Sequence, residues 1–199
     1  MVEENAVETP PEAQQAPLEL DAQVAELNAA AKAHLAKGEW EPAVECYEQV
    51  IALCEDAGQT ATKAEALNNI ASVHLALEDW EKALSYASDA RRLYQEVADG
   101  VGEAVVLNNL AAAHDGLGEW QQGMALYEEA LQLRQAAGDI EGQVKTLRNL
   151  AILNAQHDNR PKAKSYLNRA LALARQMKSQ ALLAEIRKVM SQLPRMRLR

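Results

Sequence analysis

The chain repeats itself with a period of forty residues. Trp40, Trp80 and Trp120 are spaced at this interval. Residues 61–100, aligned on residues 101–140 without a gap, give 12 identities in 40 positions. Further columns with the same spacing are Leu27, Leu67, Leu107 and Leu147; Ala31, Ala71, Ala111 and Ala151; His34, His74 and His114; and Asn69, Asn109 and Asn149. A fixed period of this length predicts an array of stacked units, none of which can bury its apolar face alone.

Each unit contains the pattern of two helices. In the third unit, residues 105–117 carry apolar side chains at helical spacing, and residues 120–136 carry a second such stripe. Gly118 follows the first run and Gly138 follows the second, where a glycine can end a helix in the left-handed conformation. The sequence therefore predicts an all-α fold, an α-solenoid of four helical hairpins with a C-terminal capping helix.

Turn residues place the boundaries of the units. Gly58 and the pair Asp99-Gly100 are expected to mark the earlier boundaries as Gly138 marks the third. The array is predicted to span residues 18–193, with repeats at about 18–58, 59–100, 101–139 and 140–178 and a capping helix at 179–193. The apolar stripe of that capping helix consists of Leu182, Leu183, Ile186, Val189, Met190 and Leu193.

The two ends of the chain differ in kind from the repeats. Residues 1–17 are acidic, contain Pro10-Pro11 and Pro17, and show no apolar period, so we predict a disordered N-terminal tail. Pro194 should stop the capping helix and leave a basic tail at 194–199.

The charge is negative overall and unevenly distributed. The formal net charge is −9, with 20 acids and 6 bases in residues 1–100 but 9 acids and 14 bases in residues 101–199. A negative chain is a poor general ligand for nucleic acid, whose binding depends on Lys and Arg neutralising phosphates. The polarity of the two ends could steer a partner, although solvated helix faces explain most charge bias of this kind.

The cysteines, the N-terminus and the length of the apolar runs bear on the cellular compartment. Cys46 and Cys54 lie eight residues apart on one predicted helix, and at about 1.5 Å per residue they are about 12 Å apart, too far for a disulfide. The acidic start Met1-Val2-Glu3-Glu4 is not followed by an apolar segment, so no secretory signal is expected. No uncharged apolar run is long enough to span a bilayer. We expect a cytoplasmic protein without membrane insertion.

Small residues give the array a family resemblance. They recur in the first helix of each unit, at Ala31, Ala71, Ala111 and Ala151; at the start of the second, at Ala43, Ala83, Gly123 and Ala163; and seven residues later, at Val50, Ala90, Ala130 and Ala170. With the segments 67–71 and 107–111 and the Trp column, this pattern resembles the tetratricopeptide repeat over residues 22–178. The usual unit has about 34 residues. Units of forty are similar to those of spindle-orientation adaptors and kinesin light chains, a resemblance that implies binding of an extended peptide in the concave groove.

The asparagine column is the first candidate binding feature. The resemblance places Asn69, Asn109 and Asn149 on the concave surface, where an amide can donate to and accept from a peptide backbone. The alternative is that these asparagines recur only because the repeat was duplicated. Residues expected to shape specificity beside them are Asn68, Ser72, Asn108, Ala112, Arg148 and Ile152.

Basic residues form a second candidate feature. Lys145, Arg148, Arg187 and Lys188 could make a basic end of the groove that suits an acidic segment or a carboxyl terminus. The alternative interpretation is a solvated helix face.

Catalytic and metal chemistry find little support in the sequence. The chain lacks a phosphate-binding loop, a dinucleotide fingerprint, a nucleophile elbow and a zinc-protease motif. Equivalent histidines on stacked repeats should lie about 8–10 Å apart, too far to share a metal ion, so His34, His74 and His114 are expected to pack half-buried.

These observations predict a protein-interaction adaptor that is not an enzyme and holds no cofactor or metal. Its partner would be a protein or peptide, for which an acidic character is one option, and not a nucleic acid. Two alternatives remain open, which are a self-associating structural scaffold and a regulatory subunit that sequesters an enzyme or transcription factor.

Overall fold

The computed structural model describes the backbone of residues 11–193 and the side chains of residues 19–193. The described part consists of helices and contains no strand, which confirms the predicted all-α class. The helices are α1 (Pro11–Lys37), α2 (Trp40–Ala57), α3 (Thr60–Ala76), α4 (Trp80–Glu96), α5 (Gly100–Gly116), α6 (Trp120–Ala136), α7 (Ile140–Gln156), α8 (Arg160–Gln176) and α9 (Gln180–Gln192).

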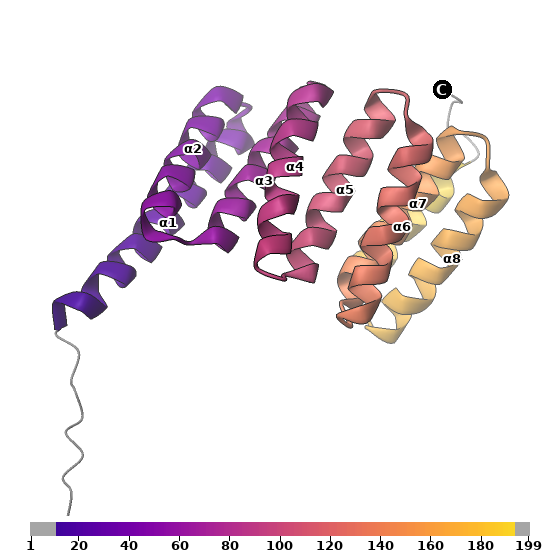
Figure 1. The fold of residues 1–199 in the computed structure, drawn as a ribbon. Coiled ribbons are helices and arrows are strands. Elements are labelled where there is room, and N and C mark those ends of the chain that lie inside the picture. Colours follow the sequence, from indigo (N-terminus) through magenta and orange to yellow (C-terminus); the bar gives the residue numbers. More distant parts are fainter. Residues whose placement is uncertain (1–10, 194–199) are drawn as a thin grey trace, which may run out of the picture.

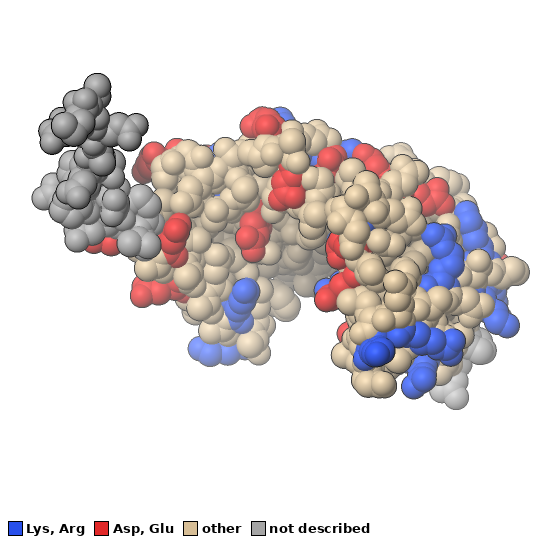
Figure 2. All heavy atoms as spheres, turned by 90° about the horizontal axis from the view of Figure 1, so that it is seen from below, with Lys and Arg blue, Asp and Glu red and all other residues tan. Residues whose placement is uncertain are grey.

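Successive helices form a row of hairpins with the two termini at opposite ends (Figure 1). The pairs α1–α2, α3–α4, α5–α6 and α7–α8 each make one repeat, and α9 packs on α7 and α8. The odd-numbered helices α3, α5, α7 and α9 contact one another in sequence, whereas the even-numbered helices are spread farther apart. This difference in spacing curves the row, so the odd-numbered helices line its inner surface. Figure 2 shows the resulting arch, with Lys and Arg gathered over its C-terminal end.

Every helix from α1 to α8 is followed within two residues by a residue with a left-handed backbone, and these residues follow one another at intervals of twenty. Glycine takes this conformation at Gly38, Gly58, Gly118 and Gly138, and other residues take it at Glu78, Ala98, Asp158 and Lys178. The predicted boundary at Asp99-Gly100 is therefore shifted. Ala98 has the positive φ of 54°, Asp99 is the N-cap that accepts from Val101 N and Gly102 N, and Gly100 is the first residue of α5.

The columns of small residues lie where the helices cross most closely. Ala31, Ala71, Ala111 and Ala151 are fully buried, as are Ala43, Ala83 and Ala163. A Cβ on Gly123 would approach the carbonyl oxygen of Ala111 to 2.7 Å, so this crossing is the tightest of its column. The small side chains allow each pair of helices to share one apolar interior without a void.

The N-terminal prediction was wrong in part. Helix α1 begins at Pro11, so residues 11–17, which we expected to be disordered, are helical. Proline is favourable at the first position of a helix, and Glu, Ala and Gln follow it, all of which are strong helix formers. Residues 1–10 and the predicted basic tail at 194–199 lie outside the described residues.

Candidate protein-binding groove

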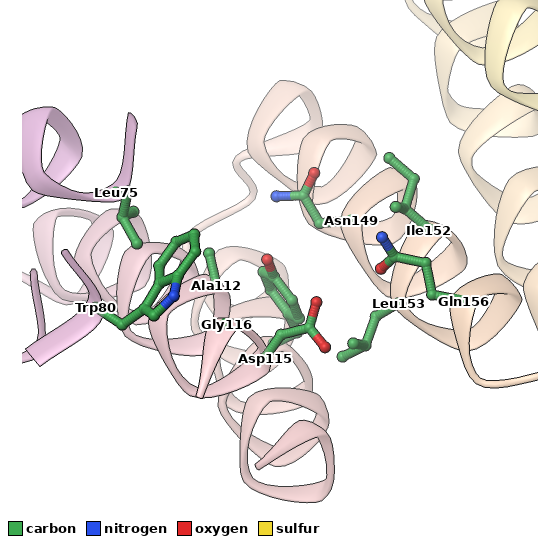
Figure 3. Close-up of a pocket in the computed structure, with 10 residues that line it drawn as sticks. Leu75, Trp80, Ala112, Asp115, Gly116, Asn149, Ile152, Leu153 and Gln156 are labelled. Atoms are coloured by element: carbon green, nitrogen blue, oxygen red, sulfur yellow. The ribbon is translucent and has the colours of Figure 1, made fainter. Parts of the chain in front are cut away.

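A cavity of about 360 Å³ lies on the inner surface, lined by residues of the second, third and fourth repeats. Three of the predicted specificity or ladder residues, Ala112, Asn149 and Ile152, line it together. Figure 3 shows Asn149, Ile152 and Gln156 of α7 on one side of the cavity and Trp80 and Leu75 on the other. The remaining lining residues are Asp115, Gly116, Tyr127 and Leu153. The cavity thus spans three repeats and combines aliphatic, aromatic and amide groups.

Trp80 reaches this cavity because the facing helix has no side chain at Gly116. A Cβ on Gly116 would lie 2.4 Å from Cδ2 and 2.6 Å from Cε2 of Trp80, which is closer than real contacts allow. The equivalent residues in the other repeats are Ala36, Ala76 and Gln156. The glycine is therefore the local feature that lets the indole lie flat against α5.

The polar side of the cavity contains a buried tyrosine and a paired carboxylate. Tyr127 is 7% exposed. Burial raises the pKa of the Tyr127 hydroxyl well above its ordinary value, and the negative charge of Asp115 adds to this shift. Nε2 of His157 lies 3.1 Å from Oδ1 of Asp115, and the His157 ring stacks on Trp120 with centroids 4.8 Å apart. The carboxylate is thereby held in a fixed position at the edge of the groove.

The three asparagines of the predicted ladder are not equivalent. Among the described residues, the side chains of Asn69 and Asn149 have no hydrogen-bond partner, and both are half-buried. Asn109 instead donates through Nδ2 to Oδ1 of Asn68 at 2.8 Å and to Oγ of Ser72 at 2.9 Å. The amide nitrogen of Asn109 is therefore engaged with the preceding repeat, and two of the three ladder amides remain available to a ligand.

Two residues expected to shape specificity serve the packing between repeats. Asn68 is 6% exposed and accepts from Asn109. Asn108 donates to the carbonyl of Ala104 at 2.9 Å and accepts from Thr146 at 3.3 Å. Both lie one position before the ladder, about 100° around the helix from it. This rotation directs their side chains towards the next helix of the inner layer instead of the open groove.

The predicted basic end is brought together only in part. Arg148 and Lys188 line a second cavity of about 290 Å³ between α7 and α9, and Ile152 lines both cavities. Nη1 of Arg148 donates to Glu185 at 2.7 Å, whereas its Nε is buried and has no hydrogen-bond partner among the residues that the structure describes. Lys145 is exposed and pairs with Glu141 at 2.7 Å, and Arg187 is exposed without lining this cavity.

Sequence comparison agrees with this architecture. The profile described as Tetratricopeptide repeat matches residues 62–136 and 102–176, and a second profile of the same description matches residues 26–61. The chain belongs to the tetratricopeptide repeat family. A search of curated protein sequences gave no match. Protein–protein interaction is the class of function that this family assignment supports.

Solved structures share the fold of the tetratricopeptide array at low sequence identity. Aspartyl phosphate phosphatase F from Bacillus subtilis superposes with a TM-score of 0.77 at 10% identity, over 86% of this chain and 45% of that protein. A Rap protein complexed with competence and sporulation factor gives a TM-score of 0.76 at 14% identity, over 85% and 47%. BtubC (BKLC) from P. vanneervenii gives 0.67 at 23% identity, over 80% and 66%. The chain thus spans about half the length of the first and second of these proteins and 66% of the third.

The histidine column of the tetratricopeptide array packs beside helix ends. Nδ1 of His34 lies 2.5 Å from Glu39, and Nδ1 of His114 lies 2.6 Å from Glu119, in each case five residues ahead. His74 stacks on Tyr86 with centroids 5.5 Å apart. No group of three or more potential metal ligands occurs among the described residues. No described helix is long and apolar enough to cross a membrane.

Sequence reasoning missed several residues that line the tetratricopeptide groove. We predicted no place in the groove for Leu75, Trp80, Tyr127 or Gln156, which line its cavity. The signal that could have located Trp80 is Gly116, since a glycine inside a helix costs stability unless close packing requires it.

Proposed function

We propose that this tetratricopeptide array is a non-catalytic adaptor that holds an extended segment of another protein in its concave groove. The observation that carries the proposal is the cavity between Trp80 and α7, because it joins three predicted groove residues to an aromatic wall. Pockets of this kind bind ligands through apolar surface and use a few placed polar groups for orientation.

The asparagines would hold the peptide backbone. The side chains of Asn69 and Asn149 are without a partner in the described part of the chain. An amide can donate to a peptide carbonyl and accept from the next N–H, so it binds an extended chain whatever its sequence. Two such contacts would set the direction and register of the ligand along the groove.

The cavity would supply specificity. Its walls are Leu75, Trp80 and Ile152, and its polar edge includes Asn149 and Gln156. This lining fits a ligand side chain with an apolar stem and a polar tip, which could pack on the indole and hydrogen-bond at its end. An acidic residue or carboxyl terminus farther along the peptide would lie near Arg148 and Lys188.

A self-associating scaffold is less well supported. Such a scaffold would need exposed apolar residues, for example at Leu75 or Leu77 or along the last helix. Leu75 lines the groove cavity, and Leu77 is 43% exposed. In α9, Leu182, Leu183, Ile186 and Val189 are buried. Single exposed apolar residues are normal on protein surfaces and do not by themselves make an interface.

We propose that the protein works in the cytoplasm, a reducing compartment in which free thiols persist. Cys46 and Cys54 are both free, and burial raises the pKa of the Cys54 thiol. Free thiols are ordinary in a reducing compartment.

The proposal can be tested with peptides selected from a random display library on the whole chain. Peptides that bind the wild type should bind the double variant Asn149→Ala, Gln156→Ala at least tenfold more weakly. A matched double variant on the outer surface, Gln121→Ala, Gln122→Ala, should bind as the wild type does. Thermal unfolding would establish that all three proteins are equally folded. Equal affinity for the groove variant and the wild type would disprove groove binding.

A further inference from the structure

The N-terminal end of the array has an open slot that is wider than its counterpart in the fourth repeat. It lies between α1 and α2, has a volume of about 640 Å³, and is larger than the groove cavity. Its apolar floor comes from Leu27, Ala30 and Leu53. The other residues that line it are Gln23, Glu26, Gln49 and Ala52. The slot is separate from the proposed peptide groove, with which it shares no residue.

The forty-residue period shows what normally covers this surface. The face of α1 formed by Glu26, Ala30 and Ala33 is exposed or half-buried. In each following repeat the equivalent face is at most 5% exposed. It consists of Ala66, Ile70 and Val73 in α3; Val106, Leu110 and Ala113 in α5; and Thr146, Leu150 and Leu153 in α7.

The covering element in the following repeats is the preceding hairpin. Ala66, Ile70 and Val73 of α3 share one apolar cluster with Tyr47 and Val50 of α2. The second helix of each repeat therefore fills the surface that the next repeat presents. At α1 the corresponding helix is missing from the described residues.

The same slot exists in reduced form in the fourth repeat. A cavity of about 270 Å³ is lined there by Leu147, Arg169 and Leu173, which are forty residues or a multiple of forty from Leu27, Gln49 and Leu53. Gln135 of the preceding α6 also lines it. The first slot is more than twice as large, and no helix of the described residues closes it from that side.

Charge limits what can fill the slot. Between residues 19 and 57 the chain carries nine acids, and its bases are Lys32 and Lys37. One of the acids is Glu26, at a position that is buried as Ala66, Val106 or Thr146 elsewhere. Residues 1–10 contain three glutamates and no base. Like charges repel, so neither that segment nor the same end of a second copy is a good match.

We propose that the slot receives a positively charged amphipathic α-helix of a partner protein, packed on α1 as α2 packs on α3. The apolar stripe of this helix would cover Leu27, Ala30 and Leu53. A Lys or Arg beside the stripe would pair with Glu26. Binding of an amphipathic helix in an apolar groove is a common mode of recognition and needs anchors at helical spacing.

The chain itself provides matched probes for this site. A peptide of residues 160–176 has the sequence of a second helix of the repeat and carries five bases and no acid. A peptide of residues 40–57 has the same place in its repeat and carries five acids and no base. Both labelled peptides would be titrated with the whole chain at low salt, with fluorescence anisotropy as the measurement.

The basic peptide should bind at least tenfold more tightly than the acidic peptide, and its affinity should fall as salt is raised. Ala30→Arg fills the slot and adds a like charge, so it should abolish this binding. Ala29→Arg, on the same helix but outside the slot, should leave it unchanged. Thermal unfolding would show whether both variants are folded.

Three results would overturn the proposal. They are equal affinity for the two peptides, no binding of the basic peptide, and binding that Ala30→Arg does not weaken. A fourth contrary result would come from light scattering. If the wild type had a mass above the 21.8 kDa of one chain and Ala30→Arg lowered it, a second copy would fill the slot. None of these results depends on groove binding, because Asn149→Ala, Gln156→Ala should leave the affinity of the basic peptide intact.

Discussion

The indole ring of Trp80 lies against Gly116 of the next repeat, at a separation that leaves no room for a β-carbon. The contact joins the start of α4 to the end of α5 and forms one wall of the groove cavity. Because Gly116 has no β-carbon, the Trp80 ring can lie in this position, and the shape of the proposed binding surface depends on that contact.

Gly116→Ala should displace Trp80 and destabilise the array by about 1–3 kcal/mol, the usual cost of overpacking. The emission of Trp80 should change with it, which a Trp40→Tyr, Trp120→Tyr background would isolate. Gly100→Ala in the same helix is the control, because its new Cβ would meet only Leu133 Cδ2 at 3.8 Å. Equal stability of the two variants in chemical denaturation would contradict the close contact.

Ala98→Gly should stabilise the protein by about 1 kcal/mol. Ala98 has a φ of 54°, and a residue with a β-carbon pays about 1–2 kcal/mol for this conformation. The reverse exchange, Gly58→Ala, should destabilise by a similar amount, since Gly58 has a φ of 69° and no neighbour within 4 Å of a new Cβ. Midpoints of urea unfolding would measure both, and shifts of the same sign would refute the argument from backbone conformation.

Asn109→Ala should lower the free energy of unfolding by about 1 kcal/mol, because it removes the hydrogen bonds to Asn68 and Ser72. Asn69→Ala should leave stability nearly unchanged, since Asn69 has no partner among the described residues. Comparing the two variants separates stability from binding, because Asn69→Ala should weaken peptide binding without lowering the free energy of unfolding. A loss of stability in Asn69→Ala comparable to that in Asn109→Ala would show that Asn69 also supports the fold.

Stability should decline in alkaline solution because buried tyrosines must ionise. Burial raises the pKa of Tyr94 to about 12, and Glu65 and Asp99 add to the shift. Burial and the hydrogen bond to Glu128 raise the pKa of Tyr166 to about 12 as well. An unfolded tyrosine ionises near pH 10, so the stabilisation is complete below about pH 10 and is lost as the pH rises towards 12.

The free energy of unfolding, measured by denaturant at pH 9 and pH 11.5, should fall less in Tyr94→Phe than in the wild type. The variant lacks the ionisable group but keeps the ring, so its stability at pH 9 serves as the control. A parallel decline in both proteins would assign the alkaline loss to other groups.

Much of the fold could be predicted from the sequence because the repeat is local. Apolar residues at helical spacing and small residues in forty-residue columns specify two helices and their crossing within one unit. The same columns predict that Ala71 and Ala111 are buried, which the structure confirms. The start of α1 was missed because residues 11–17 carry helix propensity but no apolar stripe, and only the stripe was used as the signal.

The orientation of individual polar side chains could not be predicted in the same way. Asn69 and Asn109 stand at equivalent positions, yet only Asn109 is hydrogen-bonded to its neighbour. The preceding repeat offers an asparagine to both, Asn68 to Asn109 and Asn28 to Asn69, but Lys32 stands where the next repeat has Ser72, a partner of Asn109. Equivalent positions in a repeat thus share a backbone environment without sharing partners.

The sequence by itself determined the helices, their pairing and the length of the period, because these depend on contacts within a unit and between identical neighbours. Only the tertiary structure decided where the groove has a cavity and where the array is left open. Trp80 meets Gly116 across a repeat boundary, and α1 presents Leu27 and Ala30 with no preceding hairpin among the described residues. Both features depend on how one particular repeat differs from the repeat beside it, and that relation exists only when the units are stacked in space.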